Sequence, residues 1–590
     1  MADLTETPLQ QGIVALQAIL GQGDASGLLK PVKAKNNEAA AFCFPLPEDY
    51  AGVTRTLHIG FPSTFPIEPL RLYVEPSPWL VWPHAMKSGL CLHGFKERPV
   101  TGTPEVIVRD SLSRLSSILS LSLMGSDPEH RKREFQNEIA SYWSRQHSES
   151  LQGLILLERP QAASELFALS DPRYRLPSGQ ETVWLSSSLN VIKSHFRRII
   201  GRSVKARSLS AAGYYVKLQC YPDTTFPEPK DMMDWLLPNV AAEAADTLLA
   251  WYERTGSLIS RWIILEMPGG SDAPTYTLNL YARQDNRDRS PKFNLRSSRR
   301  KQLRATGDIP ASIRSATLNI LDGRDIYSRD LSQKIRGLKD AHVVFIGVGS
   351  LGGTVVSQLA RAGLRRLTLI DPDILESANL GRHVLGADDL GKSKVQALRH
   401  RLIQDLPMVD ITAISIHAQF VMEQKPEIFE DADLVIITTA DWASEVAVWA
   451  RKSKGTRWGL LQGWSEPHTL VGQTLIAPQG AYDGRHLFSD TGDFIHRYTE
   501  WPDGGAIPLP ACGESFIPGG SVGMTSIATM VTQTAIQYLN GYYTEPAWMT
   551  SIYRPQDVQL NGGKYRGPEL LPGTVQSVLE RHWPVSGDIS

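Results

Sequence analysis

Apolar residues in the C-terminal half of the chain alternate between short continuous runs and helical spacing. Residues 343–346 form a continuous apolar run that leads into the glycine-rich segment 347–353. Apolar residues then recur at three- and four-residue spacing over 355–364, and a second run occupies 367–370. A short continuous run is typical of a buried parallel strand, and the spacing is typical of a helix. The pattern predicts two parallel strands connected by a glycine turn and a helix.

The same alternation continues toward the C-terminus. We expect strands at 411–416, 433–438, 458–462 and 471–477, and helices at 443–450 and 527–539. Strands that alternate with helices build a parallel or mixed sheet that is covered on both faces. The C-terminal part of the chain is therefore predicted to be a Rossmann-like α/β domain over 316–590.

The rest of the chain has a different order of elements. Helical spacing at 9–20 precedes strand-like runs at 39–44, 54–60 and 70–74, and helical patterns follow at 106–123 and 129–144. Further on, strand-like runs at 213–220, 262–266 and 276–281 surround a helical pattern at 239–254. We therefore predict an α+β domain over 1–150 and an α+β linker domain over 151–315.

Composition narrows the classes of function. The chain has 590 residues, of which 42% are hydrophobic and 21% charged, enough for about three to four globular domains. A net charge of −1 gives no reason to expect nucleic acid as a specific partner. The widely spaced cysteines form neither a disulfide framework nor a zinc motif, which fits a reducing compartment. The sequence shows no signal peptide and no apolar run of membrane-span length, so we expect a cytoplasmic protein without a membrane partner.

The glycine turn carries the first chemical signal. Gly347, Gly349 and Gly352 allow the backbone to approach a phosphate closely, and the start of the following helix offers unpaired N–H groups. Asp371 ends the second predicted strand, where a carboxylate can hold a ribose hydroxyl. These residues alone predict a nucleotide-binding site.

The residues behind this turn indicate which nucleotide is bound. Asp373, Asn379, Arg382 and Lys394 follow Asp371 at short intervals. Two cations and an amide suit a triphosphate better than a dinucleotide, because they neutralise charge that develops on the α-phosphate and on pyrophosphate. An NAD(P)-dependent oxidoreductase leaves both cations unexplained.

Together these motifs resemble the adenylation fold that ubiquitin-activating enzymes share with bacterial sulfur-carrier relatives. The family pattern comprises GxGxxG, DxD, SNLxR and PK, and here Ala378 replaces its serine and Ser393 its proline. The resemblance implies ATP, held by the glycine, acidic, asparagine, arginine and lysine residues named above. It also implies Mg²⁺ at Asp441, which follows the predicted strand 433–438. A helix N-cap is an equally sound reading of Asp441.

Two more residues gain a role from the same resemblance. Arg329 lies in a segment like the family's YxRQ, whose arginine reaches the ATP phosphates of the partner subunit in a homodimer. An ordinary surface arginine is the alternative. Cys512 lies in a P-x-C segment rich in glycine and proline, where the family carries its transthiolation cysteine. A chance surface thiol is the alternative there.

The N-terminal domain resembles ubiquitin-conjugating enzymes in the order of its motifs. The segment 61–69 reads FPSTFPIEP, and 89–92 reads GLCL, against the family's FPxxYPxxPP and GxICL. The resemblance implies that Cys91 is a thioester-forming nucleophile. The family's HPN triplet, whose asparagine stabilises the oxyanion, is absent, and His84 or His93 is a candidate for that role. We interpret Cys43 and Cys220 as buried apolar residues.

Both modules on one chain resemble a bacterial anti-phage fusion (CBASS) that accompanies cyclic-oligonucleotide synthases related to cGAS. This implies that the C-terminus of such a nucleotidyltransferase is activated, passed through Cys512 and then Cys91, and joined to a lysine of a target protein. Three alternatives remain open: a sulfur-carrier adenylyltransferase, an NAD(P)-dependent oxidoreductase and a catalytically inactive interaction scaffold.

Overall fold

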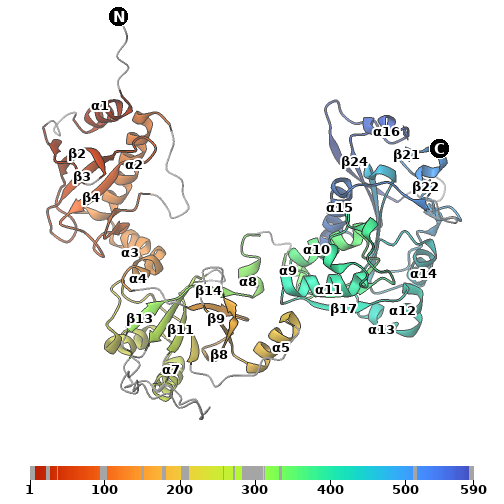
Figure 1. The fold of residues 1–590 in the computed structure, drawn as a ribbon, viewed down its shortest axis with the longest axis horizontal. Coiled ribbons are helices and arrows are strands. Elements are labelled where there is room, and N and C mark those ends of the chain that lie inside the picture. The colour runs from red at the N-terminus through yellow and green to blue at the C-terminus, as the bar shows by residue number, and fades with distance from the viewer. Residues whose placement is uncertain are drawn as a thin grey trace, which may run out of the picture. The chain divides into compact units, whose positions relative to one another are not determined.

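The computed structural model divides the chain into two compact units (Figure 1). The first comprises Met1–Leu156, Pro160–Ser188 and Ala206–Asn319, and the second Leu157–Arg159, Leu189–Lys205 and Ile320–Ser590. The structure describes residues 7–21, 27–35, 37–92, 102–147, 152–175, 181–200, 211–256, 258, 260–269, 273–281, 310, 312–330, 335–508 and 515–583.

The N-terminal domain is a four-stranded antiparallel sheet packed against a long helix. Its strands pair in the order β1-β2-β3-β4, with bounds Lys30–Val32, Glu38–Pro45, Thr56–Pro62 and Arg71–Glu75. Helix α1 (Pro8–Leu20) starts at a capping box made by Thr7 and Gln10, and α2 (Pro104–Ser122) follows Thr103 as N-cap. Apolar side chains of β3 pack with those of α2 in one core. The predicted elements of this domain are present.

Two short helices and a small hairpin complete the domain. The hairpin pairs β5 (Ala85–Met86) with β6 (Gly89–Leu90), directly before Cys91. The helical pattern at 129–144 forms α3 (Pro128–Asn137) and α4 (Ile139–Ser144) rather than one helix. The break lies at Glu138, whose backbone leaves the helical region with φ −110° and ψ 8°.

The middle of the chain forms an eight-stranded mixed sheet in the order β13-β12-β11-β10-β8-β9-β7-β14. Its strands are β7 Gln152–Leu156, β8 Ser164–Arg175, β9 Glu181–Ser186, β10 Ala211–Lys217, β11 Ser260–Glu266, β12 Thr275–Tyr281, β13 Ser312–Ser315 and β14 Leu318–Ile320. Helices α6 (Met232–Leu236) and α7 (Ala242–Arg254) pack on one face of this sheet. Helix α5 (Leu189–Ile200) belongs instead to the second unit, where Arg198 donates to the carbonyl oxygen of Val409 at 2.8 Å.

Cys220 was expected to be buried, and this expectation is wrong. Strand β10 ends at Lys217, before the cysteine, so Cys220 lies in the following turn. Its side chain is exposed, and its thiol donates to Oδ1 of Asn239 at 3.1 Å. Cys43, on β2, is half-buried.

The C-terminal domain is built on an eight-stranded sheet in the order β17-β16-β15-β18-β19-β20-β24-β26. Its strands are β15 His342–Ile346, β16 Arg366–Ile370, β17 Asp410–Ile414, β18 Leu434–Ile437, β19 Gly459–Ser465, β20 Val471–Ala477, β24 Ala547–Tyr553 and β26 Gln576–His582. Strands β15 to β19 are parallel, and β20, β24 and β26 are antiparallel to their neighbours. The predicted α/β class is confirmed.

Helices cover both faces of this sheet. Alternate residues of β15 point into two separate cores, which explains why the whole strand is apolar. One core includes α10 (Ser350–Arg361), α11 (Lys394–Asp405) and α15 (Ser521–Leu539). The other includes α12 (Ala418–Gln424), α13 (Glu427–Glu430) and α14 (Trp442–Lys452).

Short elements decorate the edges of this domain. They are α8 Gly323–Ile326, α9 Ile335–Leu338, α16 Gln556–Leu560, β21 Thr499–Glu500, β22 Ile507–Pro508, β23 Ser515–Phe516 and β25 Lys564–Tyr565. Strand β22 pairs with β23. Within the described residues, no helix has both the length and the apolar character that crossing a bilayer requires.

Candidate functional site

The glycine turn lies where the strand order of the C-terminal sheet reverses. From β15 the chain passes to β16 and β17 on one side, and then returns to β18 on the other. Crevices at the carboxyl ends of parallel strands bind ligands at such a switch point. Here the turn after β15 meets the segment after β18, because Thr438 Oγ1 donates to the carbonyl oxygen of Gly347 at 2.9 Å.

Three glycines of the turn serve different purposes. Gly347 has φ +87°, and a Cβ on it would lie 2.9 Å from the backbone N and Cα of Thr439. A Cβ on Gly352 would overlap the Gly347 carbonyl oxygen and the hydroxyl of Thr438. A Cβ on Gly349 would meet nothing within 4 Å. Packing therefore requires glycine at positions 347 and 352. Gly349 instead faces open space at the start of α10, where a phosphate can approach unpaired N–H groups.

Asp371 orders this turn from the end of β16. One carboxylate oxygen accepts the N–H of Val348 at 2.7 Å, and the other accepts the N–H of Asp373 at 2.9 Å. Burial raises the pKa of Asp371, and the two N–H donors oppose that effect. The carboxylate expected to hold a ribose hydroxyl therefore also holds the phosphate turn in shape.

The segment that carries the predicted arginine contacts this turn, because the hydroxyl of Ser350 donates to the carbonyl oxygen of Arg382 at 2.9 Å. Lys394 is buried and its Nζ lies 2.8 Å from Oδ2 of Asp373, whose side chain is exposed. Among the described residues, no carboxylate pairs with the guanidinium of Arg382. Asn379 uses its side-chain oxygen to accept the N–H of Glu376 at 3.1 Å, which stabilises the short turn that carries it.

His383 is a site residue to which the sequence assigned no role. Its Nε2 is 2.8 Å from the carbonyl oxygen of Val348, and its Nδ1 accepts the N–H of Leu385 at 3.1 Å. Burial lowers the pKa of His383, which favours the neutral ring that this pair of bonds requires. The side chain thus connects the phosphate turn to the segment that carries Arg382.

The segment after β18 presents Asp441 at the same edge of the sheet. Its side chain does not cap the backbone of α14 but accepts a hydrogen bond from the hydroxyl of Ser444. The preceding Ala440 has φ +55°, a conformation that non-glycine residues rarely adopt. Within the described residues, no group of three or more potential ligands forms a metal site. Mg²⁺ typically binds one or two carboxylates together with substrate phosphates, so a lone Asp441 fits that ion.

A buried polar network lies beneath this segment and was not predicted. Glu445 accepts hydrogen bonds from Thr439 Oγ1 at 3.2 Å and from Nε2 of Gln462 at 2.8 Å. Burial raises its pKa to about 7. In sequence, Glu445 is one polar residue on an amphipathic helix, and only the tertiary structure shows that it faces inward. Its spacing of four residues from Asp441 is the one signal that pointed to a shared face.

The structure says less about Arg329 and Cys512, the other two residues assigned a role in the C-terminal domain. Arg329 is exposed in the turn after α8. Cys512 lies outside the described residues, and so does His93 of the N-terminal domain. Their predicted roles remain predictions.

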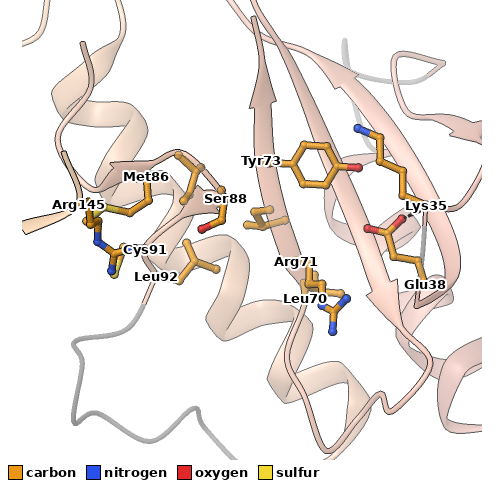
Figure 2. A pocket seen from close by; sticks show the side chains of 13 residues that line it. Lys35, Glu38, Leu70, Arg71, Tyr73, Met86, Ser88, Cys91, Leu92 and Arg145 are labelled. Carbon is orange, nitrogen blue, oxygen red and sulfur yellow. Dashed lines mark hydrogen bonds between the residues drawn. The ribbon is translucent and has the colours of Figure 1, made fainter. Parts of the chain in front are cut away.

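Cys91 lines an open groove in the N-terminal domain (Figure 2). The groove has a volume of about 620 Å³, and the thiol-bearing residue is half-buried. Cys91, Leu92 and Arg145 lie at one end of the groove, and Lys35 and Glu38 lie at the other (Figure 2). A thiol in such a groove can be reached by a bulky acyl group.

His84 does not occupy the position of a free oxyanion donor. Its Nδ1 lies 3.1 Å from Oε1 of Glu138, and its Nε2 lies 3.3 Å from Oε2 of Glu134. The hydrogen bond to Glu138 raises the pKa of His84, against the effect of burial. Both ring nitrogens are therefore used by carboxylates, which leaves the predicted oxyanion role without support from this residue.

Comparisons with known proteins agree with the geometry of the C-terminal domain. Residues 326–458 match the model of the ThiF family. The chain is 27% identical over 207 residues to the probable adenylyltransferase/sulfurtransferase MoeZ of Mycobacterium tuberculosis, covering 35% of this chain and 49% of that protein. It is 26% identical over 248 residues to the ATP-dependent ubiquitin transferase-like protein Cap2 of Pseudomonas aeruginosa, covering 39% and 42%.

Solved structures give a weaker likeness. Escherichia coli MccB in complex with ATP superposes with a TM-score of 0.29 at 17% identity, covering 38% of this chain and 68% of that one. The chain spans about half the length of the curated relatives that it matches.

Proposed function

We propose that the protein activates the C-terminal carboxylate of another protein with ATP, carries it as a thioester on Cys512 and then Cys91, and joins it to an amine of a target. The observation that carries the proposal is the cluster at the switch point. There Ser350, which follows Gly349, donates to the carbonyl oxygen of Arg382 at 2.9 Å, Lys394 pairs with Asp373, and Thr438 connects the segment before Asp441 to Gly347. This donor set suits a triphosphate and a metal ion.

The residues have distinct roles in activation. The N–H groups at Gly349 hold phosphate oxygens, and Arg382 and Lys394 neutralise charge as pyrophosphate leaves. Asp441 holds Mg²⁺ together with phosphate oxygens. In a homodimer, Arg329 of a second copy of the chain adds a further cation. Asp371 and His383 keep the turn in the required shape.

A carboxylate is a poor acyl donor, and adenylation makes AMP its leaving group. The thiolate of Cys512 attacks the mixed anhydride, forms a thioester and expels AMP. Cys91 then exchanges with Cys512, and one thiolate replaces another. A target lysine finally attacks the Cys91 thioester, loses a proton and forms an amide, and the Cys91 thiolate leaves as the C–S bond breaks. Cysteine suits each relay step because it is both a strong nucleophile and a good leaving group. Two thiols on one chain raise the effective concentration for the exchange.

The substrate that we favour is the C-terminus of a cGAS-like nucleotidyltransferase in bacterial anti-phage defence. The similarity to Cap2, which is named a ubiquitin transferase-like protein, supports a conjugating function. The presence of the Cys91 domain on the same chain supports it further, because adenylation alone does not need a second thiol.

A sulfur-carrier adenylyltransferase is the second candidate, favoured by the similarity to MoeZ. Exchange of labelled pyrophosphate into ATP, stimulated by an added protein C-terminus, tests the shared activation step. We expect exchange in the wild type and at least a tenfold loss in Lys394→Ala. If the wild type and the Cys91 variants all catalyse pyrophosphate exchange but none forms an amide product, the second candidate is supported. Absence of exchange with every C-terminus refutes both.

A further inference from the structure

The loop that carries Cys91 is tied to the helices behind it through His84. The N–H of Cys91 donates to the carbonyl oxygen of His84 at 2.7 Å, and the N–H of His84 donates to the hydroxyl of Tyr142 at 2.8 Å. The His84 ring lies between Glu134 of α3 and Glu138 at the α3–α4 break. His84 has φ +59°, in the left-handed region that residues other than glycine adopt infrequently. Four polar contacts therefore fix the residue that holds the nucleophile's amide.

The same helix, α4, is anchored on its other side in the core of the middle sheet. Trp143 is fully buried there with Ile139, and its indole N–H donates to the carbonyl oxygen of Asp223 at 3.0 Å. Gln146 donates to the carbonyl oxygen of Thr224 at 2.8 Å and accepts the N–H of Phe226 at 2.9 Å. Tyr142 and Trp143 are adjacent, so one rigid turn contacts both the Cys91 loop and the middle domain.

The charges around His84 favour its protonated form. It faces Glu134 and Glu138, and Tyr142 donates to Glu138 at 3.1 Å. His130 faces Glu134 at 3.8 Å from α3, and Arg145 acts on Glu138 from beyond the end of α4. Bonding to His84 lowers the pKa of Glu138 against the effect of burial. The His84 ring, placed between two carboxylates, thus connects the helices to the loop.

We propose that His84 is a positioning residue for acyl transfer at Cys91, and that α4 couples the Cys91 loop to the middle domain through it. The middle domain then acts as a support for the transfer site and not only as a connector. The consequence for transfer rests on the proposed function, but the coupling itself is measured without ATP or substrate.

Hydrogen exchange of the peptide that contains Cys91, in the full chain, tests the coupling. We expect His84→Gln and Tyr142→Phe each to raise its exchange rate at least tenfold. His130→Gln is the matched control, because it removes a ring from Glu134 without touching the loop, and its rate should stay within twofold of the wild type. Unchanged exchange in His84→Gln, or an equal rise in the control, overturns the proposal. Exchange in α2, measured in the same samples, verifies that each variant is folded.

The pH profile gives a readout that a simple packing role would not produce. Because the pKa of His84 is raised in the folded protein, the contacts of its protonated ring with Glu134 and Glu138 are complete at low pH and are lost as pH rises through that pKa. After correction for intrinsic exchange, the wild type should show a rise over that interval that His84→Gln lacks. A flat wild-type profile contradicts the proposal.

A last variant tests the connection to the middle domain. Gln146→Ala removes the two hydrogen bonds to Thr224 and Phe226 of the middle domain and a third to the carbonyl oxygen of Tyr142, and we expect about a threefold faster exchange at the Cys91 peptide. No change there overturns the coupling. If these results hold while no conjugation is ever detected, the proposed function fails, and the coupling of the Cys91 loop to the middle domain through His84 and α4 stands.

Discussion

Replacing Asp371 with asparagine tests whether the phosphate turn depends on this buried carboxylate. The wild-type side chain accepts two backbone N–H groups, from Val348 and Asp373, at 2.7 and 2.9 Å. Asparagine has one acceptor oxygen, so one of these N–H groups faces an amide NH₂ instead. Leaving a buried donor without an acceptor costs about 1–3 kcal/mol. At about 1.4 kcal/mol per factor of ten, the Kd for ATP should rise roughly 5- to 150-fold.

Isothermal titration with ATP and Mg²⁺ measures this effect directly. Asp405→Asn is the matched control, because it removes a charge from an exposed side chain of the same domain, which pairs with the exposed Arg361 outside the site. An exposed ion pair contributes about 0–1 kcal/mol, so the control should change the Kd by no more than about fivefold. ATP binding by Asp371→Asn within twofold of the wild type would refute the assigned role, and so would an equal loss in the control.

Three further predictions concern residues that are buried or that face open space. Burial raises the pKa of Glu445 from 4.5 to about 7, so the stability that its protonated form contributes is present below about pH 4.5 and is lost as pH rises through about 7. The free energy of unfolding should fall by up to about 3 kcal/mol over this interval. Denaturant melts at several pH values should show this fall in the wild type and not in Glu445→Gln. Gly349→Ala should keep the Tm within about 2 °C of the wild type but reduce the rate of ATP–pyrophosphate exchange at least about tenfold. Gly352→Ala should lower the Tm, because its Cβ would overlap neighbouring atoms. Wild-type exchange by Gly349→Ala contradicts the phosphate-binding role. Glu466 accepts four hydrogen bonds, so Glu466→Ala should lower the free energy of unfolding by at least about 3 kcal/mol. Glu500→Ala removes an exposed ion pair with Arg566 and should cost much less; equal losses in urea melts contradict this reading.

Periodicity identified strands β15 to β20 of the C-terminal sheet, most of which are buried on both faces, whereas β24 and the half-exposed β26 were not predicted. Every residue of β15 is buried, so the sequence shows a continuous apolar run there. Helix α5 was not predicted, although it is strongly amphipathic, because its apolar face packs on a domain that the sequence does not show to be near it. The break at Glu138 was missed for a similar reason, since its side chain bonds to His84, 54 positions away in the chain.

The sequence predicted those residues of the candidate site that come directly after a strand. The glycine turn, Asp371 and Asp441 all lie at carboxyl ends of adjacent parallel strands, as their spacing indicated. The supporting residues were not predictable. His383 and Glu445 act through contacts with other segments, and a single sequence does not distinguish them from ordinary polar residues.

The relay itself is tested most directly by a single-turnover assay on non-reducing gels with ATP and the activated protein. We expect Cys91→Ala to retain the acyl group on Cys512 as a thioester and to form no amide product. We expect Cys512→Ala to leave Cys91 uncharged. Amide formation by Cys91→Ala, or a charged Cys91 in Cys512→Ala, contradicts the proposed order of transfer.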